Sequence, residues 1–472
     1  MKGPAGVVMI GSIPMSRKSA FTLVLTLAAA IAVGASRPRA SRPPSRPAGP
    51  TFSNEVSRIF QQNCDTCHHP GDIGPFSTMT YSDAAAEADN IKYMVETRQM
   101  PPWKPVEGCS VFANPRVLAQ SEIDAIAKWV DNGAPEGKAA DLPPALHFDG
   151  GWALGQPDLI VSNPTPYTPP ATEDMYRCYS LPVPPTASAS GANLYVSAID
   201  IKPGDRQTVH HAIAFIDNSG QSATQDTGSG YPCFGGPGVG DIFSLGALGG
   251  WAPGARPYFL PDGVAMSLPK ASRIVLQVHY HPHLGRVAPD QTQMGIYLSR
   301  KLVDKIMSFL PVIQQTFTIP AGASSYAVTG AIPFIGLIPV ATHVIGIFPH
   351  MHLLGRQMKV ETSVAGGEKT CLVNIADWDF NWQGMYVYNT PVALPANSKP
   401  VVTAIYDNSS GNPKNPNTPP RDVSWGEQTT DEMCIAFLAV TFDSEHILAG
   451  VQADRSWIPP LMGTRKPVTH RN

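Results

Sequence analysis

The chain has 472 residues, which is enough for two or three domains with a substantial buried core. Its net charge of -3 and the absence of a basic block argue against nucleic acid as a partner. Charged residues make up only 15%, whereas 48 Pro and 41 Gly are present, a mixture that favours turn-rich β architecture over helical bundles.

The N-terminal segment, residues 1–35, is predicted to be an export signal. Arg17-Lys18 precede an apolar run from Ala20 to Val33, and small residues ending at Ala35 offer a cleavage site. The run is shorter than the ~20 residues that span a bilayer, so cleavage is favoured over an uncleaved anchor, which is the alternative. No other segment is long and apolar enough to cross, so we expect no stable membrane span after cleavage and a periplasmic or secreted bacterial protein.

Residues 51–137 predict a small all-α domain, which follows a linker rich in Pro, Arg and Ser at 36–50. Apolar residues recur at helical spacing in three stretches, which are Val56–Phe60, Tyr81–Thr97 and Ser121–Gly133. Ser121 is expected to cap the third helix and Gly133 to end it. The domain is therefore expected to be three helices around one short motif.

That motif is the CxxCH box Cys64-Asp65-Thr66-Cys67-His68, the attachment site of a c-type haem. The thiols of Cys64 and Cys67 would bond the haem vinyl groups, and His68 would ligate the iron. Met100, on a Pro-stiffened loop, is the expected sixth ligand, in preference to Met79 or Met94; His69 competes but follows His68 directly. The segment, with CxxCH and Met100-Pro101-Pro102-Trp103, resembles small bacterial c-type cytochrome domains.

From about residue 150 the apolar pattern changes to period two, which indicates strands separated by turns rich in Pro and Gly. Five strands are predicted at Asn193–Asp200, Val209–Phe215, Arg273–Tyr280, Thr342–Phe348 and Cys434–Phe442. One sandwich rarely needs so long a chain. We therefore predict two β-sandwich (jelly-roll-like) lobes at 150–320 and 321–455, followed by a tail at 456–472.

Two histidine pairs within these lobes are candidate copper ligands. His210 and His211 are neighbours on one strand, so both reach one metal only if the strand is twisted or lies at an edge. His350 and His352 have the parity to meet on one strand face. Imidazoles hold copper in both oxidation states, and a thioether such as that of Met433 favours Cu(I).

These motifs resemble the copper type II ascorbate-dependent monooxygenases, the family of peptidylglycine hydroxylating monooxygenase and dopamine beta-hydroxylase. The similar segments keep the family order and cover about residues 160–445; they are Val209–Ala212, Leu276–Tyr280, His350–Gly355 and Asp431–Cys434. The resemblance implies one copper held by His210, His211 and His279. It implies a second copper held by His350, His352 and Met433, where O2 is activated.

The resemblance implies hydroxylation of a small-molecule C–H bond with O2. In the family ascorbate reduces the coppers, whereas here the haem is expected to relay electrons from a periplasmic donor. The alternative is a haem and copper electron-transfer or copper-binding protein without turnover. Retention of both copper sites, including Met433, favours the enzyme, because a carrier needs only one copper site.

The substrate positions differ from those of peptide-amidating relatives, which hold a carboxylate with an Arg, an Asn and a Tyr. The matching positions here are Phe348, Ile435 and Phe437. No cation remains there to pair a carboxylate, and an apolar pocket would reject one. The sequence therefore predicts a neutral, largely apolar substrate with an activated or benzylic C–H.

The remaining cysteines and histidines are assigned less specifically. Five cysteines outside the haem box are an odd number in an oxidising space, so at least one should be free; they are Cys109, Cys178, Cys233, Cys371 and Cys434. The resemblance implies a Cys178–Cys233 disulfide and leaves Cys434 with Cys371 as a substitute partner. His281 is left outside the metal sites, although its own His-x-His motif keeps it open as a ligand. The others are taken as ordinary histidines: His147, His283, His343, His446 and His470.

Overall fold

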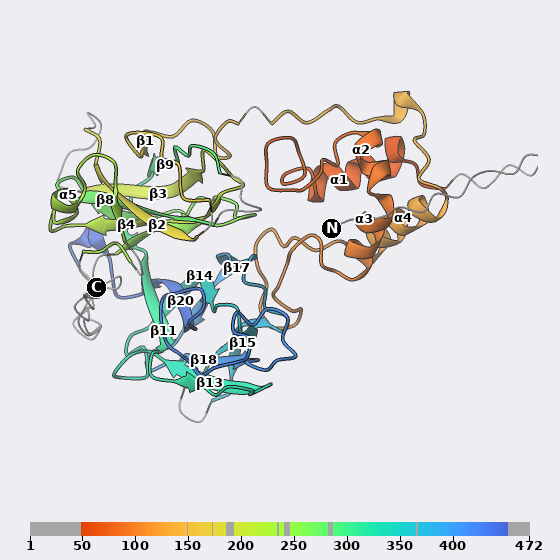
Figure 1. Ribbon diagram of the computed structural model, residues 1–472. Coiled ribbons are helices and arrows are strands. Elements are labelled where there is room, and N and C mark those ends of the chain that lie inside the picture. Colours follow the sequence, from red (N-terminus) through yellow and green to blue (C-terminus); the bar gives the residue numbers. More distant parts are fainter. Residues whose placement is uncertain are drawn as a thin grey trace, which may run out of the picture. The chain divides into compact units, whose positions relative to one another are not determined.

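A computed structural model describes residues 49–451, apart from 149, 172, 186–192, 234–235, 240–245, 282–286 and 365–366. The predicted signal peptide, nearly all of the linker and the tail lie outside the described residues, as do His283 and His470. The described chain is mostly β-sheet, with a few helices near its N-terminal end (Figure 1). Among the described residues, no helix is both long and apolar enough to cross a bilayer.

The N-terminal part, from about residue 49 to 137, is helical, as predicted. It contains a π-helix η1 (Phe52–Val56) and the α-helices α1 (Ser57–Asn63), α2 (Tyr81–Ala86), α3 (Ala88–Glu96) and α4 (Gln120–Asp131), and a 3₁₀ turn η2 (Ala139–Asp141) follows. Phe52, Phe60 and Trp129 form the centre of its core, and all three are at most 2% exposed. Trp129 Nε1 also donates to Pro135 O at 3.0 Å, so the core satisfies its one polar ring atom.

Two details of the predicted helices are corrected. The second helix is two helices, because the backbone leaves the helical region at Glu87 (φ −110°, ψ 14°). The third begins at Gln120, and Ser121 does not cap it: the Glu122 carboxylate accepts from Ala119 N at 2.8 Å and satisfies a free donor there. The end at Gly133 is confirmed by its φ of +83°.

The first β lobe is built from two five-stranded sheets. One runs in the order β1 (Leu159–Ser162), β9 (Gln293–Leu298), β3 (Asn193–Lys202), β7 (Val264–Pro269), β10 (Lys305–Ile306). The other runs β5 (Tyr231–Pro232), β2 (Met175–Pro182), β8 (Arg273–Tyr280), β4 (Val209–Asp217), β6 (Ala247–Trp251), with the short α5 (Ser222–Gln225) beside it. Side chains from both sheets share one core cluster, which is the expected sandwich arrangement.

The second β lobe is built on an eight-stranded sheet. Its order is β16 (Thr370–Ile375), β15 (Gly355–Thr362), β18 (Val401–Tyr406), β13 (Tyr326–Ala331), β11 (Ser308–Gln314), β20 (Cys434–Phe442), β14 (Thr342–His350), β17 (Tyr386–Leu394). The short β12 (Thr318–Ile319) and β19 (Val423–Ser424) form a separate pair, and η3 (Ile447–Ala449) ends the described fold. The sheet crosses the boundary predicted at 320/321, because β11 pairs along its whole length with β20.

The loop between α3 and α4 is more than the predicted Met-bearing turn, because part of it is attached to the second β lobe. A disulfide joins Cys109 to Cys371 in β16. Short bridges pair Pro105 with Ile375 and Phe112 with Tyr388. Residues that are far apart in sequence are thereby fixed to the edge strands of the eight-stranded sheet, a contact that helical periodicity does not encode.

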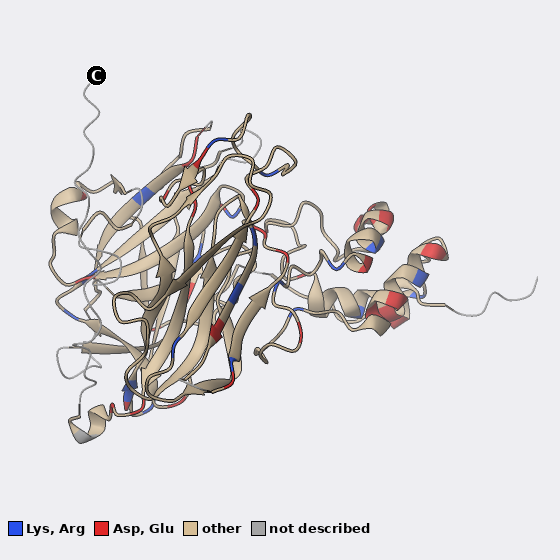
Figure 2. Ribbon diagram, turned by 90° about the horizontal axis from the view of Figure 1, so that it is seen from below, with Lys and Arg blue, Asp and Glu red and all other residues tan. Residues whose placement is uncertain are grey.

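Charged side chains are sparse on the sheets and denser on the helices, where several acidic groups stand out (Figure 2). The acidic residues of α2–α4 are Asp83, Asp89, Glu96, Glu122, Asp124 and Asp131. Strands that are buried on one or both faces have little room for charge, which explains the low overall charge content.

Candidate metal centres

Three imidazoles meet at the end of the second five-stranded sheet. His211 in β4 lies opposite His279 in β8, but a β-bulge between Val209 and His211 leaves His210 as the extra residue. A bulge bends the strand and redirects a side chain, so the neighbouring His210 and His211 need not point to opposite faces. His211 Nδ1 lies 3.2 Å from His210 Nδ1 and 3.4 Å from His279 Nδ1.

The electrostatics of this three-histidine cluster suit a cation. Burial lowers the pKa of His210 to about 3 and the pKa of His211 well below its usual value, so both rings are neutral. The nearest nitrogens of His210, His211 and His279 lie within 4.8 Å of one another, as metal ligands would. His210 Nε2 is buried and has no hydrogen-bond partner among the described residues. The donor set therefore fits a copper ion.

Asp174, in the loop before β2, contacts this cluster, and no sequence motif indicated it. Its Oδ2 lies 3.3 Å from His279 Nε2, and its Oδ1 lies 2.6 Å from His281 Nδ1. Burial alone would raise the pKa of Asp174, but the hydrogen bonds from the two histidines hold it well below its usual value. Carboxylates commonly orient metal-binding histidines in this way. His281 is thus engaged by Asp174 and is not part of the cluster.

The second histidine pair lies at the end of β14. His350 is the last residue of the strand and His352 follows it, yet their Nε2 atoms lie 3.2 Å apart. His350 Nδ1 lies 2.5 Å from Gln383 Oε1 and His352 Nδ1 lies 3.1 Å from Asp431 O. Because each Nδ1 donates to an oxygen, each Nε2 presents a lone pair toward the other. This pair therefore also fits a metal.

Glu432 fixes the backbone around this second pair. The carboxylate is fully buried and accepts from His352 N at 2.9 Å, Leu354 N at 2.6 Å and Met433 N at 3.2 Å. Burial raises the pKa of Glu432 to about 8, and the backbone donors oppose that rise. The segment after β14 and the residue before β20 are thus held by one side chain. Met433 and both histidines line the same cavity.

Phe380, in the loop between β16 and β17, lies between the two histidine groups. Its ring stacks on His210 with centroids 5.0 Å apart and planes 17° apart. It also meets His352 edge to face at 6.0 Å. The two candidate copper sites are therefore separated by one aromatic ring, which no sequence motif indicated.

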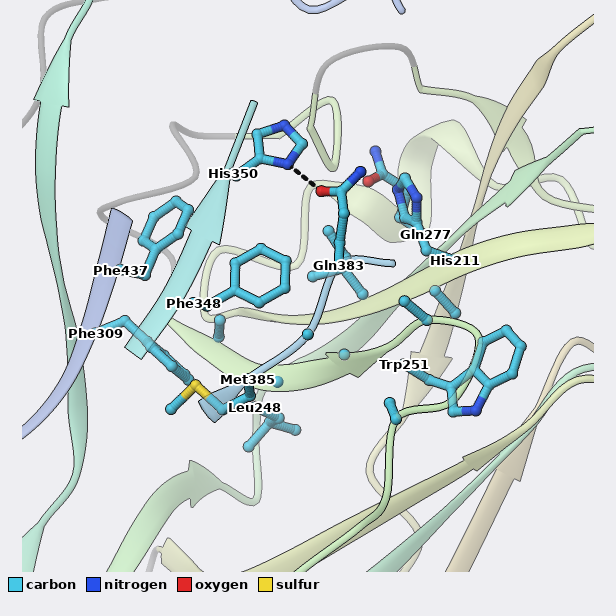
Figure 3. Close-up of a pocket in the computed structure, with 18 of the residues that line it drawn as sticks. His211, Leu248, Trp251, Gln277, Phe309, Phe348, His350, Gln383, Met385 and Phe437 are labelled. Atoms are coloured by element: carbon cyan, nitrogen blue, oxygen red, sulfur yellow. Dashed lines mark hydrogen bonds between the residues drawn. The ribbon is translucent and has the colours of Figure 1, made fainter. Parts of the chain in front are cut away.

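Both histidine groups open on a cavity of about 2650 Å³. Phe309, Phe348, Met385 and Phe437 gather on one side of it, and Gln383 reaches His350 (Figure 3). The predicted loss of cations holds at the three compared positions, but it does not hold for the cavity as a whole. Arg116 and Arg256 also line the cavity, and they lie in loops far in sequence from the three compared positions.

One of the two disulfides is the pair that the resemblance implied, and the other is a different pair. Cys178–Cys233 is confirmed, and Cys434 is free, so the expected odd thiol exists. The suggested partner Cys371 is bonded to Cys109 instead. The Tyr406 side chain hydrogen-bonds the Cys434 thiol, and burial raises the pKa of that thiol to about 12. Two disulfides fit an oxidising compartment.

The CxxCH box follows α1 and has the groups that a covalent haem needs. Cys64 and Cys67 are unpaired thiols. His68 Nδ1 lies 3.0 Å from Phe76 O, so it donates there and leaves Nε2 free to ligate iron. His69 is engaged elsewhere, since it stacks on Phe148 at 4.0 Å and lies 3.2 Å from Asp72. Met100 is half-buried, and its N–H donates to Met94 O at 3.1 Å.

Part of the chain matches a known protein family. Residues 295–445 match the family model of the copper type II ascorbate-dependent monooxygenase, C-terminal domain. The matched range holds His350, His352 and Met433, and it includes β11, in agreement with the sheet. The match supports the copper monooxygenase family for the second β lobe, and that family is a class of oxidoreductases with two bound copper ions.

Two curated relatives point the same way. DBH-like monooxygenase protein 1 of Homo sapiens is 24% identical over 258 residues, which are 50% of this chain and 40% of that protein. DBH-like monooxygenase protein 2 of Mus musculus is 26% identical over 298 residues, which are 59% of this chain and 45% of that protein. The chain thus spans less than half the length of either relative.

Solved structures add nothing to this assignment. PNGase F, a glycosylasparaginase from Flavobacterium meningosepticum, aligns with 60% of this chain and 96% of its own at 12% identity, with a TM-score of 0.24. The VP2 subviral particle of infectious bursal disease virus gives a TM-score of 0.18 at 9% identity, over 61% of this chain and 72% of its own. Scores this low carry no information about a shared fold.

Proposed function

We propose that the protein is a copper-dependent monooxygenase that hydroxylates a C–H bond of a neutral, largely apolar small molecule. The balanced reaction is R–H + O2 + 2 e⁻ + 2 H⁺ → R–OH + H2O. The observation that carries the proposal is the opening of two separate histidine groups, one beside Met433, on one largely apolar cavity. A copper monooxygenase needs one metal to meet O2 and another to store an electron.

Each group of side chains has a distinct task in this proposal. When bound, copper at His350, His352 and Met433 supplies O2 activation, and copper at His210, His211 and His279 supplies the second electron. Gln383 and the Asp431 carbonyl hold the two Nε2 atoms in place. Asp174 does the same for His279. The aromatic wall of the cavity excludes water and positions the substrate carbon.

The aromatic ring between the sites supports electron transfer from one copper to the other. Replacing Phe380 with Leu should remove the stacking on His210 and the edge contact to His352 while keeping an apolar side chain. We expect hydroxylation of ethylbenzene, a neutral benzylic probe, to fall about tenfold, a typical cost for a lost neighbour of metal ligands. Steady-state turnover with copper content measured in parallel checks this.

The matched control is Phe334→Leu, the same change at a ring that is 62% exposed in the same lobe. It should leave turnover unchanged. Equal turnover in Phe380→Leu and the control, with two copper ions in each, would mean that the ring plays no part in the reaction.

The cavity wall at Phe348 carries the substrate proposal. Phe348 meets Phe437 at 6.4 Å between centroids, and it is half-buried. Arg at this position would bury an uncompensated charge in an apolar wall, which is costly. We expect Phe348→Arg to lower ethylbenzene turnover more than tenfold, whereas Phe348→Leu changes it little. Improved turnover in Phe348→Arg would overturn the apolar-substrate proposal.

We also propose that a covalent haem c on Cys64 and Cys67 relays electrons from a donor outside the cytoplasm, in a bacterial periplasm. His68 would be one axial ligand and Met100 the other. The unpaired thiols and the oriented His68 ring support this. Two contacts support a path toward copper: Trp251 in β6 lies opposite Ala212, the residue after His211, and the Arg206 guanidinium lies 6.0 Å from the Trp251 ring.

Rapid-mixing spectroscopy tests this relay. Pre-reduced holoprotein is mixed with oxygenated buffer, and the haem absorption is followed with and without copper and ethylbenzene. We expect fast reoxidation of the haem only when copper, substrate and O2 are all present. Reoxidation at the same rate in copper-free protein would contradict the relay. Stoichiometric copper and haem without oxygen consumption on any substrate would instead indicate an electron carrier.

A further inference from the structure

One face of the eight-stranded sheet carries apolar side chains that begin at the second histidine pair. Successive side chains of a strand alternate between its two faces, so His350, Phe348 and Gly346 of β14 lie on the same face. The rings agree with this, since those of Phe348 and His350 are stacked with centroids 6.3 Å apart. Phe437 of β20 lies directly opposite Phe348. The two phenyl rings are thus the first apolar side chains beyond the histidine.

Further apolar side chains follow on the neighbouring strands, away from the histidines. Ala439 of β20 pairs with Gly346 on one side and with Phe309 of β11 on the other, and paired residues share a face. Met385, just before β17, reaches the same level of the sheet, because a Cβ on Gly346 would come within 2.7 Å of Met385 Cε. We call the four large side chains the apolar row, namely Phe348, Phe437, Phe309 and Met385.

The apolar row has a definite length and a closed end. His350 and Gly346 are four positions apart in β14, which at about 3.3 Å per residue is about 13 Å. At that end Phe309 and Met385 pack against the core cluster of the first β lobe. Leu248 of β6 also lines the cavity there, and Figure 3 shows it farther from His350 than Phe348 is. The cavity is therefore blind on this side.

The charged groups of the cavity lie away from the apolar row. Those among the described lining residues are Arg116, Asp200, Arg256, Glu427 and Asp431. None of these five belongs to β11, β14, β17 or β20. Gln383 bonds His350 at the histidine end of the row. A ligand that lies along the row therefore meets mostly carbon beyond the histidine, a surface that rejects polar groups.

We propose that the substrate is an extended apolar molecule, of the class of long-chain alkyl-aromatic hydrocarbons. Its reacting carbon lies beside His350 and Met433, and its apolar body lies along the apolar row. This inference rests on the proposed function and adds a length to the substrate. A single aromatic ring contacts only Phe348 and Phe437 and leaves the far half of the row unfilled. Phe309 and Met385 then determine how long a substrate the site accepts.

The test measures how strongly alkylbenzenes of increasing chain length bind. Ethyl-, butyl-, hexyl- and octylbenzene are equilibrated with the oxidised, copper-loaded holoprotein, which cannot turn over without electrons. Headspace gas chromatography gives the free concentration of each compound. We expect the Kd to fall about fourfold for each added methylene, which corresponds to about 0.8 kcal/mol per buried CH2. A Kd that does not depend on chain length would overturn the proposal.

Met385→Trp places a larger side chain at the blind end of the apolar row. We expect octylbenzene to bind about 16-fold more weakly, equivalent to the loss of about two buried methylenes. Ethylbenzene is too short to reach Met385 and should lose far less. Phe309→Trp fills the same end from β11 and should show the same selective loss. The matched control is Phe334→Trp, at a ring that is 62% exposed and does not line the cavity.

Two outcomes with these variants would contradict the proposal. Octylbenzene binding that is unchanged in either Trp variant would mean that the ligand does not extend to this end. Equal weakening of ethylbenzene and octylbenzene would place the substituted side chain at the reacting end instead. Copper content and Tm equal to those of the wild type establish that a variant has folded.

Turnover distinguishes the failure of this inference from the failure of the proposed function. If the reduced holoprotein hydroxylates ethylbenzene but binding shows no dependence on chain length, only the extended substrate falls. If binding depends on chain length but no alkylbenzene is hydroxylated, the monooxygenase proposal falls. The apolar row would then bind a ligand that is not a substrate.

Discussion

Replacing Glu432 with Ala is expected to destabilise the second β lobe by at least about 3 kcal/mol. The substitution leaves three backbone N–H groups without an acceptor: those of His352 and Leu354, which are buried, and that of Met433, which is partly buried. Each unsatisfied buried donor costs about 1–3 kcal/mol. Thermal unfolding followed by near-UV circular dichroism measures the effect, which should appear as a fall in Tm of about 6 °C or more.

Glu432→Gln is the more discriminating variant, because the amide keeps one acceptor oxygen but turns an NH2 group toward the remaining donors. We expect it to be destabilised nearly as much as Glu432→Ala. Glu368→Ala removes an exposed carboxylate from the same lobe and should leave Tm within about 1 °C. A Tm for Glu432→Ala that matches this control would show that the buried carboxylate does not hold the two segments together.

Replacing Met433 with Leu is expected to lower the affinity for one of the two Cu(I) ions by about 100-fold or more and to abolish hydroxylation. Leu has a similar volume but no thioether, so the fold is preserved while the soft ligand is lost. Loss of a residue that merely supports a ligand costs 10–100-fold, so loss of a ligand should cost at least as much. Competition with a Cu(I) chelator on reduced protein measures the two affinities separately.

Met351→Leu is the matched control, since Met351 is a fully buried core residue between the two histidines in sequence. It should retain both Cu(I) affinities. Two unchanged affinities in Met433→Leu would remove Met433 from the copper site and leave the histidine pair without its proposed sulfur ligand.

Local patterns predicted the strands well, because alternation of apolar residues depends only on which side chains are buried. β8 and β20 have the predicted bounds, and β3, β4 and β14 each extend two residues further. The predicted helix at Tyr81–Thr97 was wrong in one respect, since nothing in its apolar spacing marks the break at Glu87. The structure thus differs from the prediction where no local pattern marks the feature.

The metal-site prediction depended on motif order, and the motifs do converge. His210 and His211 required a strand irregularity, and the bulge beside Val209 is that irregularity. His352 lies past the end of β14, so strand parity was the wrong reason for a correct juxtaposition with His350. Their common cavity could not be predicted, because it depends on how two lobes pack.

The supporting residues escaped prediction because each acts across a long sequence separation. Gln383 and Phe380 reach the histidines from a loop without a motif. Cys109 reaches Cys371 from a helical domain, which no strand pattern indicates. Arg116 lines the cavity from the loop between α3 and α4, which also contains Cys109. Glu432 is the one supporting residue with a signal in the sequence, because it lies directly before the predicted ligand Met433.

A single-turnover experiment with isotopically labelled oxygen tests the central claim most directly. Fully reduced holoprotein, loaded with copper and saturated with ethylbenzene, is mixed with ¹⁸O2, and the product is analysed by mass spectrometry. The account predicts 1-phenylethanol carrying one ¹⁸O atom, with a total of two electrons lost from the haem and the two coppers for each product molecule. Product that carries oxygen from water, or oxidation of the metals without any product, would contradict it.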